Sequence, residues 1–300
     1  MVSFNPEDFT RIYSALILPC NADESIHWES LRALVDRQIA DGVEGFYCCG
    51  SSGEGLLMTL EERKRFVEVV VDQAAGRVPV IAHIGTIRTA DVIELARHAK
   101  NCGCVAISMI PPYYYKFSQT EIAEYYEDVI QAVPDLPVIL YNIPQFTGIE
   151  FGKANAARLL DNPNIIGIKH TSNNLYSMER MATAYPEKLL INGFDEQLLG
   201  ALSMGAVATV STTANLFAPL FVAIRREYQA GNMKKALEYQ QALNLRVEEL
   251  CRLGIFPATK YACTLRGIDC GPCRRPFHAL DDEAKEAVRK LMALPYPEGV

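Results

Sequence analysis

The 300-residue chain has a formal net charge of −7, with 49% hydrophobic and 22% charged residues. This balance is typical of a globular protein with a large core, and neither a basic patch nor a basic domain indicates a nucleic-acid partner. No run approaches the roughly 18 apolar residues of a membrane-spanning helix. Nine cysteines, an odd number, and an N-terminus without a signal-peptide pattern predict a reduced, cytoplasmic protein.

Short apolar runs alternate with amphipathic stretches along the first two thirds of the chain. Each run is almost continuously hydrophobic, as in a strand that is covered on both faces. The expected strands are Tyr13–Leu18, Gly45–Cys49, Val78–His83, Val105–Ile110, Pro137–Tyr141, Ile165–Lys169, Leu189–Asn192 and Ala206–Val210. Eight strand–helix units favour an α/β fold closed into a (β/α)₈ TIM barrel. A doubly wound sheet is the alternative, but no GxGxxG motif follows the first strand.

Helical patterns fill the spaces between these strands and continue after the eighth. A capping box at Thr59–Glu62 opens a helix that runs to about Ala74. The other expected helices are Ser30–Ala40, Thr89–Lys100, Ser118–Ala132, Gly152–Leu160, Leu175–Ala184, Glu196–Met204, Leu216–Gln229, Met233–Arg252, Thr259–Leu265 and Asp281–Leu294. We therefore divide the chain into a barrel, 1–215, and a C-terminal helical extension, 216–300, packed on the barrel or on another subunit.

In a TIM barrel the active site lies at the C-terminal ends of the strands, so the residues there are the candidates. After the second strand, Gly50–Glu54 combines two glycines with two hydroxyls, and its backbone N–H groups are suited to an anion. The alternative is a plain turn between strand and helix. Three tyrosines, 113–115, follow the fourth strand; they form either a buried subunit contact or a phenol that projects into a neighbouring site.

Lys169 ends the sixth apolar run and is the sharpest candidate. Lysine is seldom buried without a function or a partner, and burial lowers its pKa, which leaves part of it as the nucleophilic neutral amine. The alternative is a structural ion pair. Tyr141 ends the fifth run and is either a proton shuttle or a core residue with a satisfied hydroxyl. His170 points to the opposite side of its strand and is interpreted as a packing residue.

Two carboxylates, Asp195 and Glu196, follow the seventh strand, and a hydroxyl-rich turn, Ser211–Asn215, follows the eighth. The carboxylates are candidate metal ligands, general bases, hydroxyl binders or simple helix caps. No histidine pair accompanies them, so a metal site is the weakest of these interpretations. Cys270 and Cys273 have the spacing of a redox or metal motif, but they lack a second pair, which favours a structural loop.

A lysine, a phenol and an anion-binding turn at one end of the barrel suit a 2-oxo acid. Its carboxylate would lie in the turn, its ketone carbon at the amine and its protons within reach of the phenol. A protonated Schiff base is an electron sink, so the bond between C3 and C4 can break or form. We therefore expect a small-molecule substrate and neither a cofactor nor a metal.

These residues resemble the N-acetylneuraminate lyase and dihydrodipicolinate synthase superfamily over nearly the full chain. The matching segments are Ala15–Pro19, Gly50–Glu54, Pro112–Tyr114, Tyr141–Pro144, Thr147–Gly148 and Gly167–Lys169. The resemblance implies that Lys169 forms the Schiff base, that Tyr141 relays protons and that Ser51 and Ser52 bind the carboxylate. It also implies that Tyr114 completes the relay of a neighbouring subunit, in a homotetramer built as a dimer of dimers.

Several positions lean towards the lyase branch of this superfamily. Phe146 stands where the synthase branch usually has an arginine for a second carboxylate, and Gly193–Glu196 resembles a lyase segment whose carboxylates hold sugar hydroxyls. Thr171 also matches the lyase. Ser52 stands where threonine is usual in both branches. The turn after the eighth strand is more similar to that of the synthase, and in it Thr212 replaces a lyase serine that contacts substrate.

The resemblance thus implies a class I aldolase that cleaves N-acetylneuraminate to N-acetylmannosamine and pyruvate. Another pyruvate-dependent aldolase or dehydratase acting on a different sugar acid is the first alternative, and dihydrodipicolinate synthase the second. A non-catalytic 2-oxo-acid sensor ranks last, because Lys169, Tyr141 and the two serines are all present.

Overall fold

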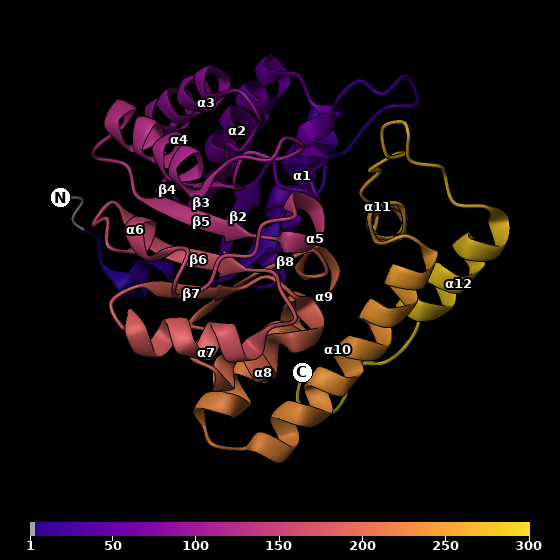
Figure 1. Ribbon diagram of the computed structural model, residues 1–300. Helices are drawn as coiled ribbons and strands as arrows, with labels where there is room; N and C mark the ends of the chain where they lie inside the picture. The colour runs from indigo at the N-terminus through magenta and orange to yellow at the C-terminus, as the bar shows by residue number, and fades with distance from the viewer. Residues whose placement is uncertain (1–3) are drawn as a thin grey trace.

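Eight parallel strands form a closed barrel in the structure, a computed structural model that describes residues 4–300 (Figure 1). The strands are β1 Ile12–Ala15, β2 Gly45–Cys48, β3 Val80–His83, β4 Ala106–Met109, β5 Val138–Asn142, β6 Ile165–His170, β7 Leu189–Asn192 and β8 Ala208–Ser211. Each pairs with the next along the chain, and β1 pairs with β8 to close the circle. The predicted TIM barrel is confirmed, and every strand is buried along its whole length, which explains its continuous hydrophobicity.

Helices follow the strands, and all but α5, which lies at the cavity, cover the outside of the barrel. They are α1 Trp28–Ala40, α2 Leu60–Ala74, α3 Thr89–Cys102, α4 Gln119–Ala132, α5 Pro144–Thr147, α6 Ala157–Leu160, α7 Leu175–Ala184, α8 Leu198–Ser203 and α9 Ala214–Gln229. Short 3₁₀ turns occur at Pro6–Phe9 (η1), Gly55–Leu57 (η2) and Asp195–Gln197 (η3). The capping box predicted for α2 is present, with Thr59 and Glu62 exchanging hydrogen bonds.

The segment after β5 differs from the sequence-based expectation. A helix was predicted over 152–160, but only α6, Ala157–Leu160, is helical. Asn155 explains the difference, because its side chain accepts from the N–H of Gly152 and donates to the carbonyl of Glu150. Such side-chain bonds offer the backbone an alternative to the helix ladder.

The protein has two apolar cores, one on each side of the sheet. The larger lies between the strands and the helices. The smaller fills the barrel and contains Tyr13, Tyr47, Tyr141, Ile166 and Ile191 among others. An interior packed with side chains makes the barrel a solid support, so a ligand can enter only at its end.

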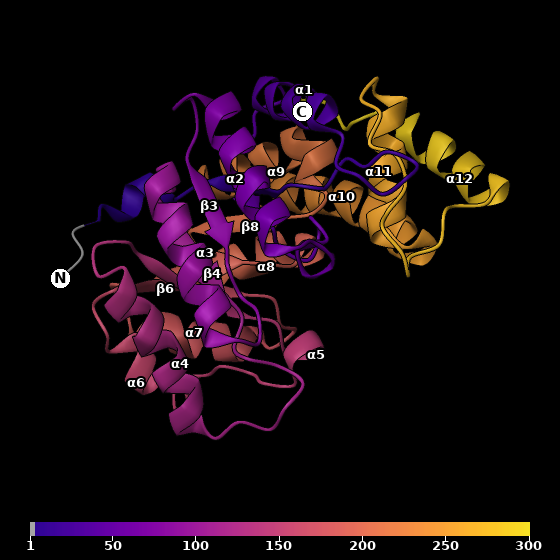
Figure 2. The ribbon, with the colours of Figure 1, turned by 90° about the horizontal axis from the view of Figure 1, so that it is seen from above.

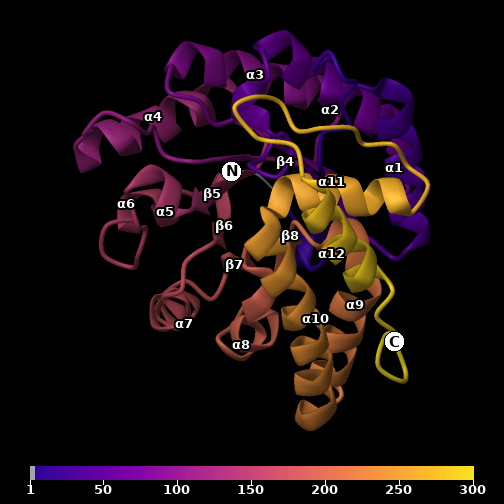
Figure 3. The same cartoon turned by 90° about the vertical axis from the view of Figure 1, so that its right-hand side faces the viewer.

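Three further helices complete the chain: α10 Met233–Leu253, α11 Ile255–Leu265 and α12 Asp282–Met292. Figures 1 and 2 place α11 and α12 to one side of the barrel, and Figure 3 shows α10 and α11 in front of the strand ends. α9 contacts β1, α1 and α8, as the eighth outer helix of a barrel would. The division at residue 215 stays a prediction. Within residues 4–300, no helix is both long and apolar enough to cross a membrane.

Candidate active site

Lys169 lies one residue before the end of β6, inside the C-terminal end of the barrel. Its side chain is buried, with 4% of the residue exposed. In the ladder between β5 and β6, Tyr141 is directly paired with Lys169. The parallel register therefore brings together two residues that are 28 positions apart in the sequence.

Two aromatic rings surround the amine of Lys169. Its Nζ lies 3.9 Å from the ring centroid of Tyr141 and 4.3 Å from that of Tyr47. Burial lowers the pKa of Lys169 to about 7, although the charge of Asp195 acts in the opposite direction. The rings favour the charged amine, but loss of water is the larger effect. A substantial fraction of this lysine is therefore a neutral nucleophile near pH 7.

The phenol of Tyr141, unlike the amine of Lys169, keeps its proton at neutral pH. Burial raises the pKa of Tyr141 to about 12, and the nearby hydroxyls of Ser51 and Thr171 act in the opposite direction. The phenol is therefore protonated at neutral pH and can donate to a bound ligand. A neutral amine beside a protonated phenol is a suitable pair for attack on a carbonyl with proton transfer.

The turn after β2 supplies hydroxyl groups to the same place. Ser51 and Ser52 both line the cavity above Lys169, as does Thr212 from the turn after β8. The hydroxyls of Ser52 and Thr212 are 2.7 Å apart and hydrogen bonded. Three hydroxyls converging from two turns can hold a carboxylate next to the amine.

Thr171 and Gly193 form the adjacent wall. Thr171 Oγ1 is buried and has no hydrogen-bond partner within residues 4–300. A Cβ at position 193 would lie 1.8 Å from that oxygen, so only glycine fits there. Because an unpaired buried hydroxyl is costly, Thr171 has the properties of a group that bonds to a ligand or a water.

The two carboxylates after β7 have different surroundings. Asp195 is buried, and its Oδ2 accepts from the N–H and the hydroxyl of Thr213 at 2.7 and 2.6 Å. Glu196 is exposed at the rim. Burial raises the pKa of Asp195. Partial loss of water, with the charge of Asp195, raises the pKa of Glu196. Asp195 therefore holds the turn after β8, and Glu196 is the freer hydroxyl acceptor.

These side chains surround one cavity of about 180 Å³. It brings together nine of the ten site residues predicted from the sequence: Ser51, Ser52, Tyr141, Lys169, Thr171, Gly193, Asp195, Glu196 and Thr212. Tyr114 is the exception. It is 85% exposed, its φ is +75°, and its ring packs edge-to-face on Tyr115 with centroids 5.1 Å apart.

Other residues that bear on the site were missed in the sequence. Tyr47 contacts the amine, and the buried ring of His83 packs edge-to-face on Tyr141 with centroids 5.7 Å apart. Alternation along the expected strands would have placed both inside the barrel. The extension also contributes to the cavity wall, with Val247, Cys251, Ile255 and Phe256. No local pattern marks these four residues.

His170 and the cysteines have roles outside the cavity. The ring of His170 is buried and interacts with Asn142 Nδ2 at 3.0 Å and the carbonyl of Asn174 at 3.2 Å. Within residues 4–300, the one grouping of three metal-type ligands is Glu68, His98 and Cys102, on α2 and α3. None of the three lines the cavity.

Comparison with known proteins agrees with this geometry. The model of the dihydrodipicolinate synthetase family matches residues 8–294. An N-acetylneuraminate lyase of Rhizobium meliloti is 41% identical over 94% of each chain. A Ruminococcus gnavus sialic acid aldolase, solved as a catalytic lysine mutant, is 30% identical with a TM-score of 0.93, covering 97% of this chain and 96% of that one. Dihydrodipicolinate synthase DapA-2 of Bacillus anthracis is 27% identical with a TM-score of 0.91, covering 98% and 100%.

The fold alone does not separate the two branches, because both give similar TM-scores. Relatives from Rhizobium meliloti and Clostridium perfringens both bear the lyase name, which agrees with the preference for the lyase branch inferred from Phe146 and Gly193–Glu196. The resemblance is confirmed: the chain is a carbon–carbon lyase that belongs to the dihydrodipicolinate synthetase family.

Proposed function

We propose that the protein is a class I aldolase that cleaves N-acetylneuraminate to N-acetylmannosamine and pyruvate through an imine on Lys169. The observation that carries the proposal is the amine of Lys169, buried, with a pKa of about 7, beside Tyr141 and the hydroxyls of the β2 turn. The names of the relatives support the sugar acid as substrate.

In this reaction the neutral Nζ of Lys169 attacks C2 of the open-chain 2-oxo acid, and loss of water gives a protonated imine. The Tyr141 phenol oxygen takes the proton of the C4 hydroxyl while it passes its own proton to the substrate carboxylate. The C3–C4 bond breaks, N-acetylmannosamine leaves as the aldehyde, and the bond electrons move into the imine to form an enamine. The relayed proton is then returned to C3, and hydrolysis of the imine by water releases pyruvate and restores the amine. Ser51, Ser52 and Thr212 hold the carboxylate throughout.

The outer part of the cavity supports a long, hydroxylated substrate. Glu196 lies at the rim with an exposed carboxylate, and Phe146, also exposed, offers no cation to a second carboxylate. A dicarboxylic product would therefore meet a negative charge without compensation. This difference favours the lyase reaction over the synthase reaction.

The decisive experiment combines cleavage with trapping. The purified protein is expected to release pyruvate from N-acetylneuraminate, and borohydride reduction with pyruvate is expected to add mass to Lys169 alone. Lys169→Met should abolish both signals, whereas Lys188→Met, a half-buried lysine outside the cavity, should leave both unchanged. An adduct at another residue would refute the imine, and faster turnover of aspartate semialdehyde or another 2-oxo sugar acid would refute the substrate.

A homotetramer with Tyr114 completing the site of a neighbour is also part of this proposal. Tyr114 and Tyr115 expose 85% and 63% of their surfaces, and Tyr114 has a left-handed backbone. Large exposed rings of this kind are typical of a contact surface. Sedimentation should give a tetramer, and Tyr114→Ala should shift the protein towards smaller species.

The nine free cysteines support a reducing, cytoplasmic location.

A further inference from the structure

A fully buried ion pair joins the C-terminal extension to the turn that carries Ser51 and Ser52. Lys260 Nζ of α11 lies 2.7 Å from Glu54 Oε1, and the two side chains are 1% and 0% exposed. Removing two charges from water is costly, so the presence of a buried ion pair is weak evidence that the pair stabilises the fold. A role in positioning is the alternative, and the surrounding contacts indicate what is positioned.

Glu54 belongs to the turn itself, two residues after Ser52. Its N–H donates to the carbonyl of Ser51 at 3.1 Å, and its backbone is left-handed, with a φ of +53°. A non-glycine residue in this region stores strain that the surrounding structure must compensate. The next residue must be glycine, because a Cβ on Gly55 would lie 1.9 Å from the carbonyl of Cys49. The turn is thus held in a conformation that it would not favour alone.

The other end of the network is the segment after α11. Lys260 Nζ also donates to the carbonyl of Pro272 at 2.6 Å. The second oxygen of Glu54 accepts from the N–H of Arg274 at 2.7 Å. The Arg274 guanidinium pairs with Glu62 of α2 and donates to the carbonyl of Leu57. We call Glu54, Lys260 and Arg274 the clamp.

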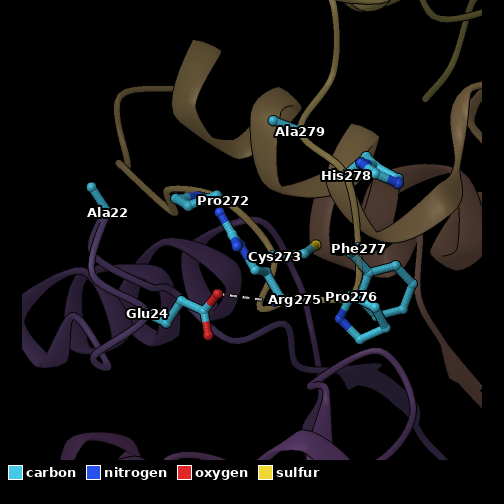
Figure 4. A pocket seen from close by; sticks show the side chains of 9 residues that line it. All are labelled: Ala22, Glu24, Pro272, Cys273, Arg275, Pro276, Phe277, His278 and Ala279. Atoms are coloured by element: carbon cyan, nitrogen blue, oxygen red, sulfur yellow. Dashed lines mark hydrogen bonds between the residues drawn. The ribbon is translucent and has the colours of Figure 1, made fainter.

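A second, larger cavity lies next to the clamp, lined by the chain neighbours of Arg274 and by none of the three clamp residues. This groove, about 910 Å³, lies between the loop at Ala22–Glu24 and the segment 272–279 (Figure 4). The Glu24 carboxylate crosses it and accepts from the N–H of Arg275 at 3.1 Å. Phe277 of the groove packs edge-to-face on Phe256, which lines the active-site cavity. The segment is therefore connected to the site at two places, through the clamp and through Phe256.

We propose that Glu54 and Lys260 are positioning residues that fix the β2 turn so that Ser51 and Ser52 can recognise the carboxylate of a 2-oxo acid. Neither side chain lines the active-site cavity, so they act through the turn and touch no substrate. The inference rests on the proposed imine chemistry. Displacing a positioned group by about 1 Å can cost roughly 100-fold in rate, so a relaxed turn should have a large effect on carboxylate recognition.

The test compares two ketones that differ in the carboxylate. Borohydride trapping on Lys169 is measured with pyruvate and with hydroxyacetone, which lacks the acid group. The main variant is the double change Glu54→Met and Lys260→Met, because removing both charges at similar volume is tolerated, whereas removing one leaves a buried charge unpaired. The pyruvate concentration for half-maximal trapping should rise by roughly 100-fold, and trapping of hydroxyacetone should stay unchanged.

Glu54→Gln is the second variant, since the amide keeps the shape, but its single oxygen can accept from Lys260 or from the N–H of Arg274 and not from both. It should show the same selectivity loss in weaker form, about 10-fold. The control removes a surface pair away from the turn, Glu127→Met with Arg158→Met, and should leave both ketones unaffected. Equal losses for both ketones, or an unchanged ratio in folded variants, would overturn the inference. If the unaltered protein trapped neither ketone, the proposed imine itself would be at fault.

Discussion

The inner and outer ends of the active-site cavity are built in different ways. Lys169 and Tyr141, at the inner end, are strand residues that the β5–β6 register places side by side in the barrel. The outer end consists of turns and of the extension, with Glu196 and Phe146 exposed and Phe256 contributed by α11. A rigid inner end suits bond making and breaking, whereas turns can change with little effect on the barrel. This difference explains how one fold can serve both branches of the family.

Tyr141→Phe tests the inner end and should have the largest effect. The variant should fold and still trap pyruvate, but turnover should fall by about 10²–10⁴-fold, because the proton relay is lost. Tyr126→Phe is the matched control, since it removes a buried phenol outside the cavity. Steady-state pyruvate release measures both variants, and normal turnover in Tyr141→Phe would make this residue a bystander.

Glu196→Gln tests the outer end and separates it from the inner one. A hydrogen bond to a charged group contributes about 1.5–3 kcal/mol, so kcat/KM for N-acetylneuraminate should fall by roughly 10- to 100-fold. Borohydride trapping of pyruvate should be unaffected. Glu248→Gln, an exposed α10 carboxylate outside this cavity, serves as the control. A parallel loss of trapping would show that the two ends are not independent.

Replacing Asp195 is expected to lower stability as well as cleavage, unlike replacing Glu196. Because Asp195 Oδ2 holds both the N–H and the hydroxyl of Thr213, its removal leaves these groups without their acceptor. Asp195→Ala should therefore lower the melting temperature as well as cleavage, while Glu196→Gln lowers cleavage alone. Differential scanning calorimetry decides the point, and equal melting temperatures would assign both carboxylates to substrate.

The pH dependence of trapping reports on the inner end alone. The pKa of Lys169 is lowered to about 7, so the neutral amine dominates above this pH and decreases about tenfold for each unit below it. The initial rate of imine formation should rise from pH 5 and level off above pH 7 to 8. A midpoint close to the ordinary lysine value would show that the amine is not desolvated.

Chelation should have the smallest effect, at either end. Dialysis against a chelator is expected to leave pyruvate release unchanged, because the imine serves as the electron sink. The grouping of Glu68, His98 and Cys102 lies on the outer helices, so a metal there would not touch the substrate. Loss of activity that a divalent cation restores would contradict this prediction.

The sequence by itself determined the barrel, the family and most of the inner end of the site. Each depends on local patterns: apolar runs for strands, a lysine at the end of one run, and two serines between glycines. The helix expected over 152–160 is present only at Ala157–Leu160, because the side chain of Asn155 competes for the backbone groups before it. The roles given to Lys169, Tyr141 and the other site residues stay predictions until the variants are measured.

Only the tertiary structure decided how the site is completed and held. The contact of Tyr47 with Lys169 and the bond of Asp195 to Thr213 join residues that are distant in the sequence. The pair of Glu54 and Lys260 spans 206 positions. Burial, and with it the pKa of Lys169, arises from all the elements that close around a group. The periodicity and motifs near each of these residues do not predict its contacts with distant parts of the chain.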